Sequence, residues 1–147
     1  MTTLTRRYGF SASHQLRAAS YSEERNREVF GKCSNAFGHG HNYYLEVSVQ
    51  GDPDPATGMV LPREALDRWV TGAVLDRIDH THLNTEVPDF RTLVPTSENL
   101  ILVVETWLRE AWREHFADQP VRLAGLRLEE TPRNSFRLPP PGLLDTQ

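Results

Sequence analysis

Three stretches of the chain alternate apolar with polar or small residues, a period-two pattern typical of strands that bury one face. They cover residues 4–14, 39–49 and 121–130. In the third stretch the alternation slips at Ala124-Gly125, which predicts a β-bulge. The sequence therefore predicts three long strands, one of them bulged.

Two apolar stripes at helical spacing predict two helices. Pro62 opens the first at a position that tolerates its missing N–H, and the stripe continues to Ile78. The second begins at Thr96 or Ser97, either of which is a good N-cap. Glu98 in its first turn is favoured by the helix dipole.

The remaining segments are shorter or more polar. Residues 17–31 have weak periodicity and indicate a long excursion with room for a helical turn. Residues 59–61 predict a short strand, and a last strand follows around Phe136. The order strand, strand, short strand, helix, helix, strand, strand predicts an α+β domain whose antiparallel sheet carries two helices on one face.

Length and composition narrow the class of protein. With 147 residues and 38% hydrophobic content, the chain is expected to form a single domain over residues 1–138, followed by a Pro-rich tail at 139–147. It contains no apolar run of about 18 residues that would cross a membrane. The net charge of -4 and the scattered arginines argue against a nucleic-acid surface. One cysteine cannot form an internal disulfide, so a cytoplasmic location is expected.

Histidines at the ends of the first two strands are candidate metal ligands. His39 and His41 are two residues apart and therefore project from the same face of a strand. His14 ends the neighbouring strand in FSASH, whose small residues leave space around its ring. Three neutral histidines are sufficient for a catalytic zinc that keeps a fourth position open. The alternative is an ordinary pair of surface histidines without a metal.

Cys33 lies six residues before His39 and allows three interpretations. As a fourth zinc ligand it would close the site and make it structural. As a nucleophile or base, it would need a nearby cation to lower its pKa. As a buried thiol it would be inert, which is the common fate of an isolated cysteine.

Two acidic positions could also carry chemistry. Asp79 precedes His80, and a carboxylate beside an imidazole can form a proton relay, although adjacent side chains need a loop geometry to meet. The alternative is that His80 or His82 caps the first helix. Glu130 shares its strand face with inward-facing leucines, so it requires a donor: a guanidine-like edge of a ligand, or an arginine.

Taken together, these clusters resemble the 6-pyruvoyl-tetrahydropterin synthase family. Seven segments match in the family's order and span the chain from residue 8 to about 138: FSASH at 10–14, FGKC at 30–33, GHGHNY at 38–43, DPATGMV at 54–60, IDHTHLN at 78–84, PTSEN at 95–99 and LEET at 128–131. The chain departs from the pattern at Gln15, where arginine is common, at Phe37, and in the Pro132-Arg133 turn after Glu130.

The resemblance implies a T-fold: a four-stranded antiparallel sheet with two helices per subunit. Three subunits join their sheets into a barrel, and two such rings stack into a homo-hexamer. It also implies a division of labour among the candidate residues: zinc on His14, His39 and His41, catalysis by Cys33 with Asp79 and His80, Glu130 anchoring the pterin, and Thr96 and Glu98 contacting its ring.

Two activities occur in the family, and both act on 7,8-dihydroneopterin triphosphate. One forms 6-pyruvoyl-tetrahydropterin and the other 6-carboxy-tetrahydropterin, with acetaldehyde released. Five residues separate Cys33 from His39, as in the pyruvoyl-forming branch, where the carboxy-forming branch has three. The sequence therefore favours the pyruvoyl-forming synthase. A non-catalytic zinc module or a pterin-binding protein without turnover are the alternatives from other classes.

Overall fold

One sheet organises the fold, and its long strands follow the period-two stretches of the sequence. We analysed a computed structural model, which describes residues 1–139. β1 (Thr2–His14) and β2 (His39–Gly51) pair antiparallel along their whole length, with His14 opposite His39. β4 (Val121–Thr131) pairs antiparallel with β2, and β5 (Asn134–Leu138) with β4. The pairing of β2 with β4 shifts register opposite Ala124, which confirms the predicted bulge.

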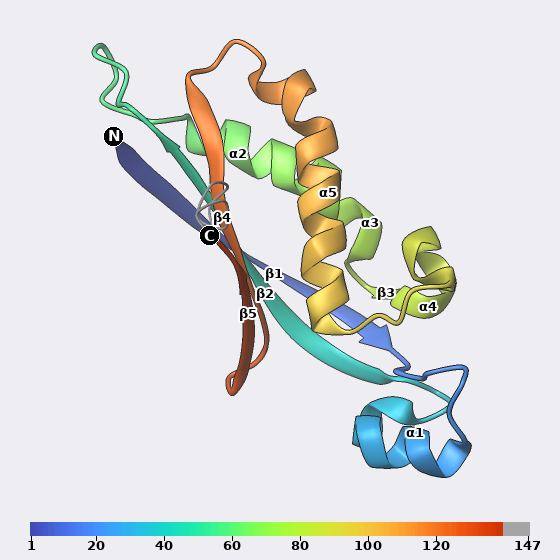
Figure 1. Cartoon of the computed structure of the whole chain (residues 1–147). Coiled ribbons are helices and arrows are strands. Elements are labelled where there is room, and N and C mark those ends of the chain that lie inside the picture. Colours follow the sequence, from blue (N-terminus) through green and yellow to red (C-terminus); the bar gives the residue numbers. More distant parts are fainter. Residues whose placement is uncertain (140–147) are drawn as a thin grey trace, which may run out of the picture.

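Helices cover one face of this sheet (Figure 1). The first predicted helix is a continuous helical stretch made of three pieces: α2 (Arg63–Val70), a π-helical turn η2 (Thr71–Leu75) and α3 (Asp76–Ile78). The second is α5 (Ser97–Phe116), whose N-cap is Thr96. Trp69 joins the two helices, since its indole N–H donates to the Leu108 carbonyl at 3.2 Å.

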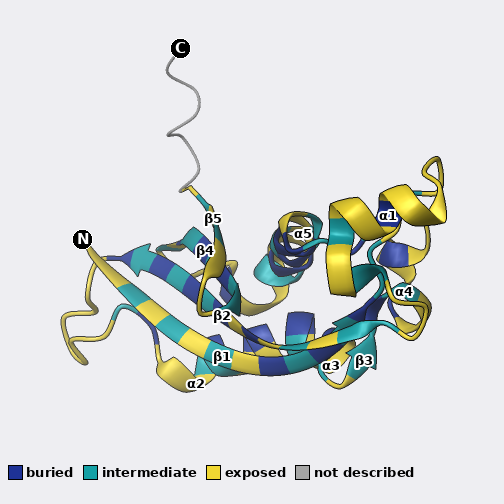
Figure 2. Ribbon diagram, turned by 90° about the horizontal axis from the view of Figure 1, so that it is seen from below, coloured by how far each residue is buried: buried dark blue, intermediate teal, exposed yellow. Residues whose placement is uncertain are grey.

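Shorter elements lie near the end of the sheet where His14 is found. They are α1 (Glu23–Phe30), a 3-10 turn η1 (Gly31–Ser34), β3 (Thr81–His82), α4 (Leu83–Glu86) and a second 3-10 turn η3 (Pro88–Arg91). In Figure 2 the dark blue, buried positions of the strands alternate with teal or yellow, less buried positions, as the period-two pattern requires.

Two predictions about the sheet were wrong. Within residues 1–139 it has five strands in the order β3-β1-β2-β4-β5, because the two-residue β3 pairs parallel with Ala12 and Ser13 at the outer edge of β1. Residues 59–61 form a bend instead of a strand. The preceding turn closes on itself, with the Asp54 N–H donating to the Met59 carbonyl at 2.9 Å.

Three further expectations concern membrane spans, the segment before Cys33 and the C-terminal tail. Within residues 1–139, no helix has the length and apolar character needed to cross a membrane, while the predicted cytoplasmic location stays a prediction. The polar excursion before Cys33 contains a true helix, α1. Apart from Pro139, the predicted tail at 139–147 lies outside the described residues.

Candidate metal and acid–base centre

The three predicted histidines gather on the helix-covered face of the β1–β2 pair. His14 ends β1 and His41 stands opposite Ala12, so their side chains point to the same face. The ring centres of His14 and His41 are 5.0 Å apart, and those of His39 and His41 are 4.7 Å apart. The sheet therefore builds the histidine cluster that the sequence predicted.

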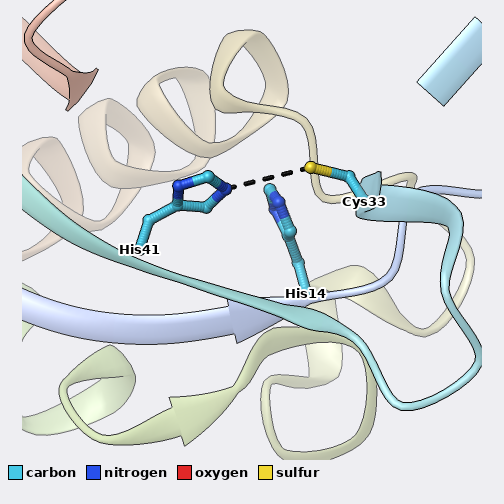
Figure 3. A group of neighbouring side chains, drawn as sticks. All are labelled: His14, Cys33 and His41. Atoms are coloured by element: carbon cyan, nitrogen blue, oxygen red, sulfur yellow. Dashed lines mark hydrogen bonds between the residues drawn. The ribbon is translucent and has the colours of Figure 1, made fainter. Parts of the chain in front are cut away.

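The closest potential metal ligands are His14, His41 and Cys33. One ligand atom from each of them lies within 4.8 Å of the others, and no further group of three such side chains is found among the described residues. Figure 3 shows the Cys33 thiol facing the His41 ring, with 3.9 Å between Sγ and Nε2. His39 is not a member of this group, although its ring packs against His41. Its role as a ligand stays a prediction.

His14 has the tautomer and the burial that suit a metal ligand. The side chain is fully buried, and Nδ1 lies 2.9 Å from the Pro95 carbonyl oxygen. Because a carbonyl can only accept, Nδ1 carries the proton and Nε2 is left with its lone pair. This Nε2 atom is buried and has no hydrogen-bond partner among the described residues. The site thus fits a cation such as zinc, held by nitrogen and sulfur donors.

Glu130 completes the charge pattern of the cluster. As predicted from its strand parity it points inward, with a side chain only 13% exposed, and its Oε1 lies 3.6 Å from His41 Nε2. The arginine alternative applies to its neighbour instead, since Glu129 pairs with Arg7 and Arg127. No described arginine pairs with Glu130, so its carboxylate is available to a ligand.

Burial and charge shift the acid–base properties of these groups. Burial raises the pKa of the Cys33 thiol, and the Glu130 carboxylate raises it further. Burial lowers the pKa of His14, partly offset by the Pro95 hydrogen bond, and burial also lowers the pKa of His41. Neutral imidazoles are the form that binds a metal. A cation beside Cys33 would act against the raised thiol pKa.

Asp79 and His80 form a pair, but away from Cys33. His80 has a positive φ of 59°, the loop geometry that adjacent side chains need, and its Nδ1 is 3.0 Å from Asp79 Oδ1. Asp79 Oδ1 also accepts the Ser11 N–H at 2.9 Å. The His80 backbone N–H donates to the Ser11 carbonyl at 2.6 Å, and its side chain is 82% exposed with no described hydrogen bond to the preceding helix.

This pair lies at the outer edge of β1. Ser11 and Asn42, which hydrogen-bond each other at 2.7 Å, belong to the strand face opposite that of His14 and His41. His80 lines a pocket of about 500 Å³ together with Ser11 and Asn42. The same pocket also includes Ala12 and His41, and Asp79 binds the edge of β1 at the Ser11 N–H. Within one subunit, the Asp79–His80 pair therefore lies at the outer edge of β1, outside the group of His14, Cys33 and His41.

The two remaining predicted residues are at the start of α5. Thr96 caps the helix, its Oγ1 accepting the Asn99 N–H at 3.3 Å, and Glu98 is exposed in the first turn. Their contact with a ligand stays a prediction.

Sequence reasoning missed two residues that support the cluster. The Tyr43 hydroxyl is 3.4 Å from His14 Nδ1 beneath the histidines, and burial raises its pKa well above the usual range. His82 belongs to β3 and packs under the turn before His39, with a buried Nδ1 that has no partner among the described residues. Its spacing from His80 is visible in the sequence, but the two-residue strand that orients it is not.

Gly38 fixes the turn that connects η1 to β2, and we expect Gly38→Ala to destabilise the fold by about 3 kcal/mol. Its φ is +82°, and a Cβ there would lie 2.9 Å from His82 Nε2 and 3.2 Å from the His14 carbonyl oxygen. Gly58→Ala is the matched control, since Gly58 also has a positive φ of +71° but nothing within 4 Å. The control should lose only about 1 kcal/mol in urea unfolding. Equal losses would mean that the contact with His82 and His14 is unimportant.

Comparison with known proteins yields a family and several similar chains. A family model described as 6-pyruvoyl tetrahydropterin synthase matches residues 3–140. A 6-pyruvoyl tetrahydrobiopterin synthase from Poecilia reticulata is 39% identical over 132 residues, which are 89% of this chain and 85% of that protein. The protein of that name from Homo sapiens is 44% identical over 101 residues, 69% of this chain and 70% of the human one.

A solved structure is also similar. The 6-pyruvoyl tetrahydropterin synthase of Caenorhabditis elegans superposes with a TM-score of 0.81 at 37% sequence identity, covering 94% of this chain and 94% of that one. This similarity agrees with the T-fold that the sequence resemblance predicted for the chain.

Proposed function

Because the chain belongs to the 6-pyruvoyl tetrahydropterin synthase family, we propose that it converts 7,8-dihydroneopterin triphosphate into 6-pyruvoyl-tetrahydropterin and releases triphosphate. The observation that carries the proposal is the cluster of His14, His41, Cys33 and Glu130 on one face of the sheet. This cluster brings together two histidines that can bind a metal, the Cys33 thiol, and the Glu130 carboxylate, with which no described arginine pairs. The reaction couples an elimination to internal redox of the substrate and needs no nicotinamide or flavin.

The metal would be zinc, held by His14 and His41 with His39 as the third predicted ligand. The buried lone pair of His14 Nε2 supports this assignment. When bound, zinc supplies Lewis acidity toward the side-chain hydroxyls of the substrate. The Pro95 carbonyl keeps the His14 ring in the required tautomer and orientation.

Cys33 is proposed as the base that removes a proton from a carbon of the substrate side chain. Its thiol faces the histidines from η1, close to where the side-chain hydroxyls would lie. Glu130 would accept the N–H groups of the pterin ring in two parallel hydrogen bonds and hold the reacting C–H toward the thiolate. Thr96 and Glu98 are proposed to contact the same ring.

Asp79 and His80 are proposed to exchange protons with the oxygens of the side chain. Since they lie at the outer edge of β1 and outside the group that contains Cys33, they would serve a site of a neighbouring subunit. The edges of the sheet support such an assembly. Among the described residues, β1 is paired at its outer edge only through Ala12 and Ser13, and natural proteins avoid long unpaired edges. We propose a hexamer of two stacked trimeric barrels.

The product assay tests the proposed function. We expect the purified protein with zinc to turn 7,8-dihydroneopterin triphosphate into 6-pyruvoyl-tetrahydropterin and triphosphate, identified by mass, without any further cofactor. The five-residue spacing between Cys33 and His39 supports this product. Acetaldehyde appearing in step with triphosphate would replace the proposal by the carboxy-forming activity. Tight binding of the substrate without turnover would leave only a pterin-binding protein.

A further inference from the structure

The residue that follows His14 is held by a side chain from a distant segment. Asn84, in α4, donates from Nδ2 to the Gln15 carbonyl at 2.9 Å and accepts the Gln15 N–H on Oδ1 at 2.8 Å. These two bonds imitate the pairing of a neighbouring strand at the point where β1 has ended. The Gln15 backbone is therefore fixed directly beside the fully buried His14.

From this fixed backbone, the Gln15 side chain reaches the segment that carries Cys33. Its Nε2 donates to the Ser34 carbonyl at 3.1 Å. The next residue adds a second link, since the Leu16 N–H donates to the Cys33 carbonyl at 2.7 Å. Both links join η1 to the residues just after β1, and they end on the consecutive carbonyls of Cys33 and Ser34.

η1 has few other means of holding its position. It is a 3-10 turn of four residues with no buried member. Apart from the 3.9 Å contact of Cys33 Sγ with His41 Nε2, its remaining described hydrogen bonds stay within the local chain, such as Ser34 Oγ to the Gly31 carbonyl at 2.8 Å. Turns with few buried apolar contacts have low local stability. A thiol that must meet a particular substrate carbon therefore depends on the links that anchor η1.

We propose that Gln15 is a positioning residue, which holds the Cys33 thiol against the histidine cluster through the Ser34 carbonyl while Asn84 holds Gln15. The proposal rests on the proposed function, in which Cys33 is the base. A donor of suitable reach is the property that the position requires.

The test compares Gln15→Met, which has a similar length but no donor, with Gln15→Arg, which restores N–H donors. We expect Gln15→Met to lower kcat about tenfold with KM and zinc content changed less than about twofold, because small misplacements of a reacting group are costly. Gln15→Arg should retain at least about half of the wild-type kcat, a rescue that a merely space-filling role would not give. Gln119→Met is the matched control on an exposed residue and should leave kcat unchanged.

A second readout does not depend on turnover. Cys33 is the only cysteine, so iodoacetamide labelling of the zinc-depleted protein reports on this thiol alone. We expect labelling of Gln15→Met to be at least about threefold faster than that of the wild type and of Gln119→Met, because η1 opens more often. Unchanged kcat and labelling in Gln15→Met would overturn the proposal, and so would loss of zinc, which would assign Gln15 to His14 instead. If the wild type itself has no turnover, the proposed function fails, while the labelling still tests the anchoring of η1.

Discussion

Replacing Cys33 with alanine is expected to lower kcat by about 10³-fold or more while the protein keeps its fold and its zinc. The size follows from losing a base that removes a proton from carbon, since general acid–base groups contribute about 10²- to 10⁴-fold. Zinc should stay because the thiol, in the proposed mechanism, acts on the substrate. The measurements are kcat with 7,8-dihydroneopterin triphosphate, zinc per chain by metal analysis, and thermal unfolding.

The same experiment also decides between a catalytic and a structural role for Cys33. Cys33 has a potential ligand atom within 4.8 Å of those of His14 and His41, a distance set that also suits a closed structural site. In that case Cys33→Ala would lose zinc and unfold at a lower temperature, and the catalytic interpretation would be wrong. His14→Ala serves as the control, because losing the buried Nε2 should remove most of the zinc under either interpretation.

Regular patterns made most of the fold predictable. β1, β2 and β4 each keep a period of two over many residues, and α5 has both an apolar stripe and the Thr96 cap. These signals are local and are repeated along the element, so tertiary contacts reinforce them. The bulge opposite Ala124 was predictable for the same reason, because it interrupts a pattern that is otherwise regular.

Short elements escaped prediction because nothing repeats in them. β3 consists of two residues, and its pairing with Ala12 and Ser13 depends on where the preceding helix ends. α1 buries only Asn26, so it has almost no apolar stripe, although Ser22 as N-cap and the acids after it were visible signals. The apolar segment at 59–61 suggested a strand, yet packing, not pairing, accounts for its one buried residue, Leu61.

For the site, the sequence predicted which histidines meet, since two strands with known faces fix them. It left open whether Cys33 lies within ligand distance of His14, because η1 has no periodicity and is placed by the long-range bonds of Gln15 and Leu16. The sequence also did not predict how the Asp79 and His80 side chains are oriented, because their orientation depends on the positive φ of His80.

The position of the Asp79–His80 pair leads to a second prediction. Two variants that are each inactive alone should form active hexamers when they assemble together. Cys33→Ala removes the proposed base from the histidine cluster, and His80→Ala removes the proposed relay from the edge of β1. Each variant alone should lose at least about 10²-fold in kcat. Neither change is expected to unfold the chain, since Cys33 is only partly buried and His80 is 82% exposed.

If each site combines Cys33 of one subunit with His80 of the next, a mixed ring contains sites in which both residues are intact. Random assembly of equal amounts gives an intact pair at about one quarter of the sites, and therefore about a quarter of the wild-type kcat per subunit. The two variants are co-expressed with different tags, and hexamers that carry both tags are purified and assayed. The control is a mixture of the two variants after each has assembled separately, and this mixture should stay inactive. Mixed hexamers that stay inactive would show that Cys33 and His80 must come from one chain, and a monomer in light scattering would remove the shared site altogether. Because the Asp79–His80 pair lies at the outer edge of β1, where a neighbouring subunit can join the sheet, and outside the group that contains Cys33, we expect the mixed hexamers to be active.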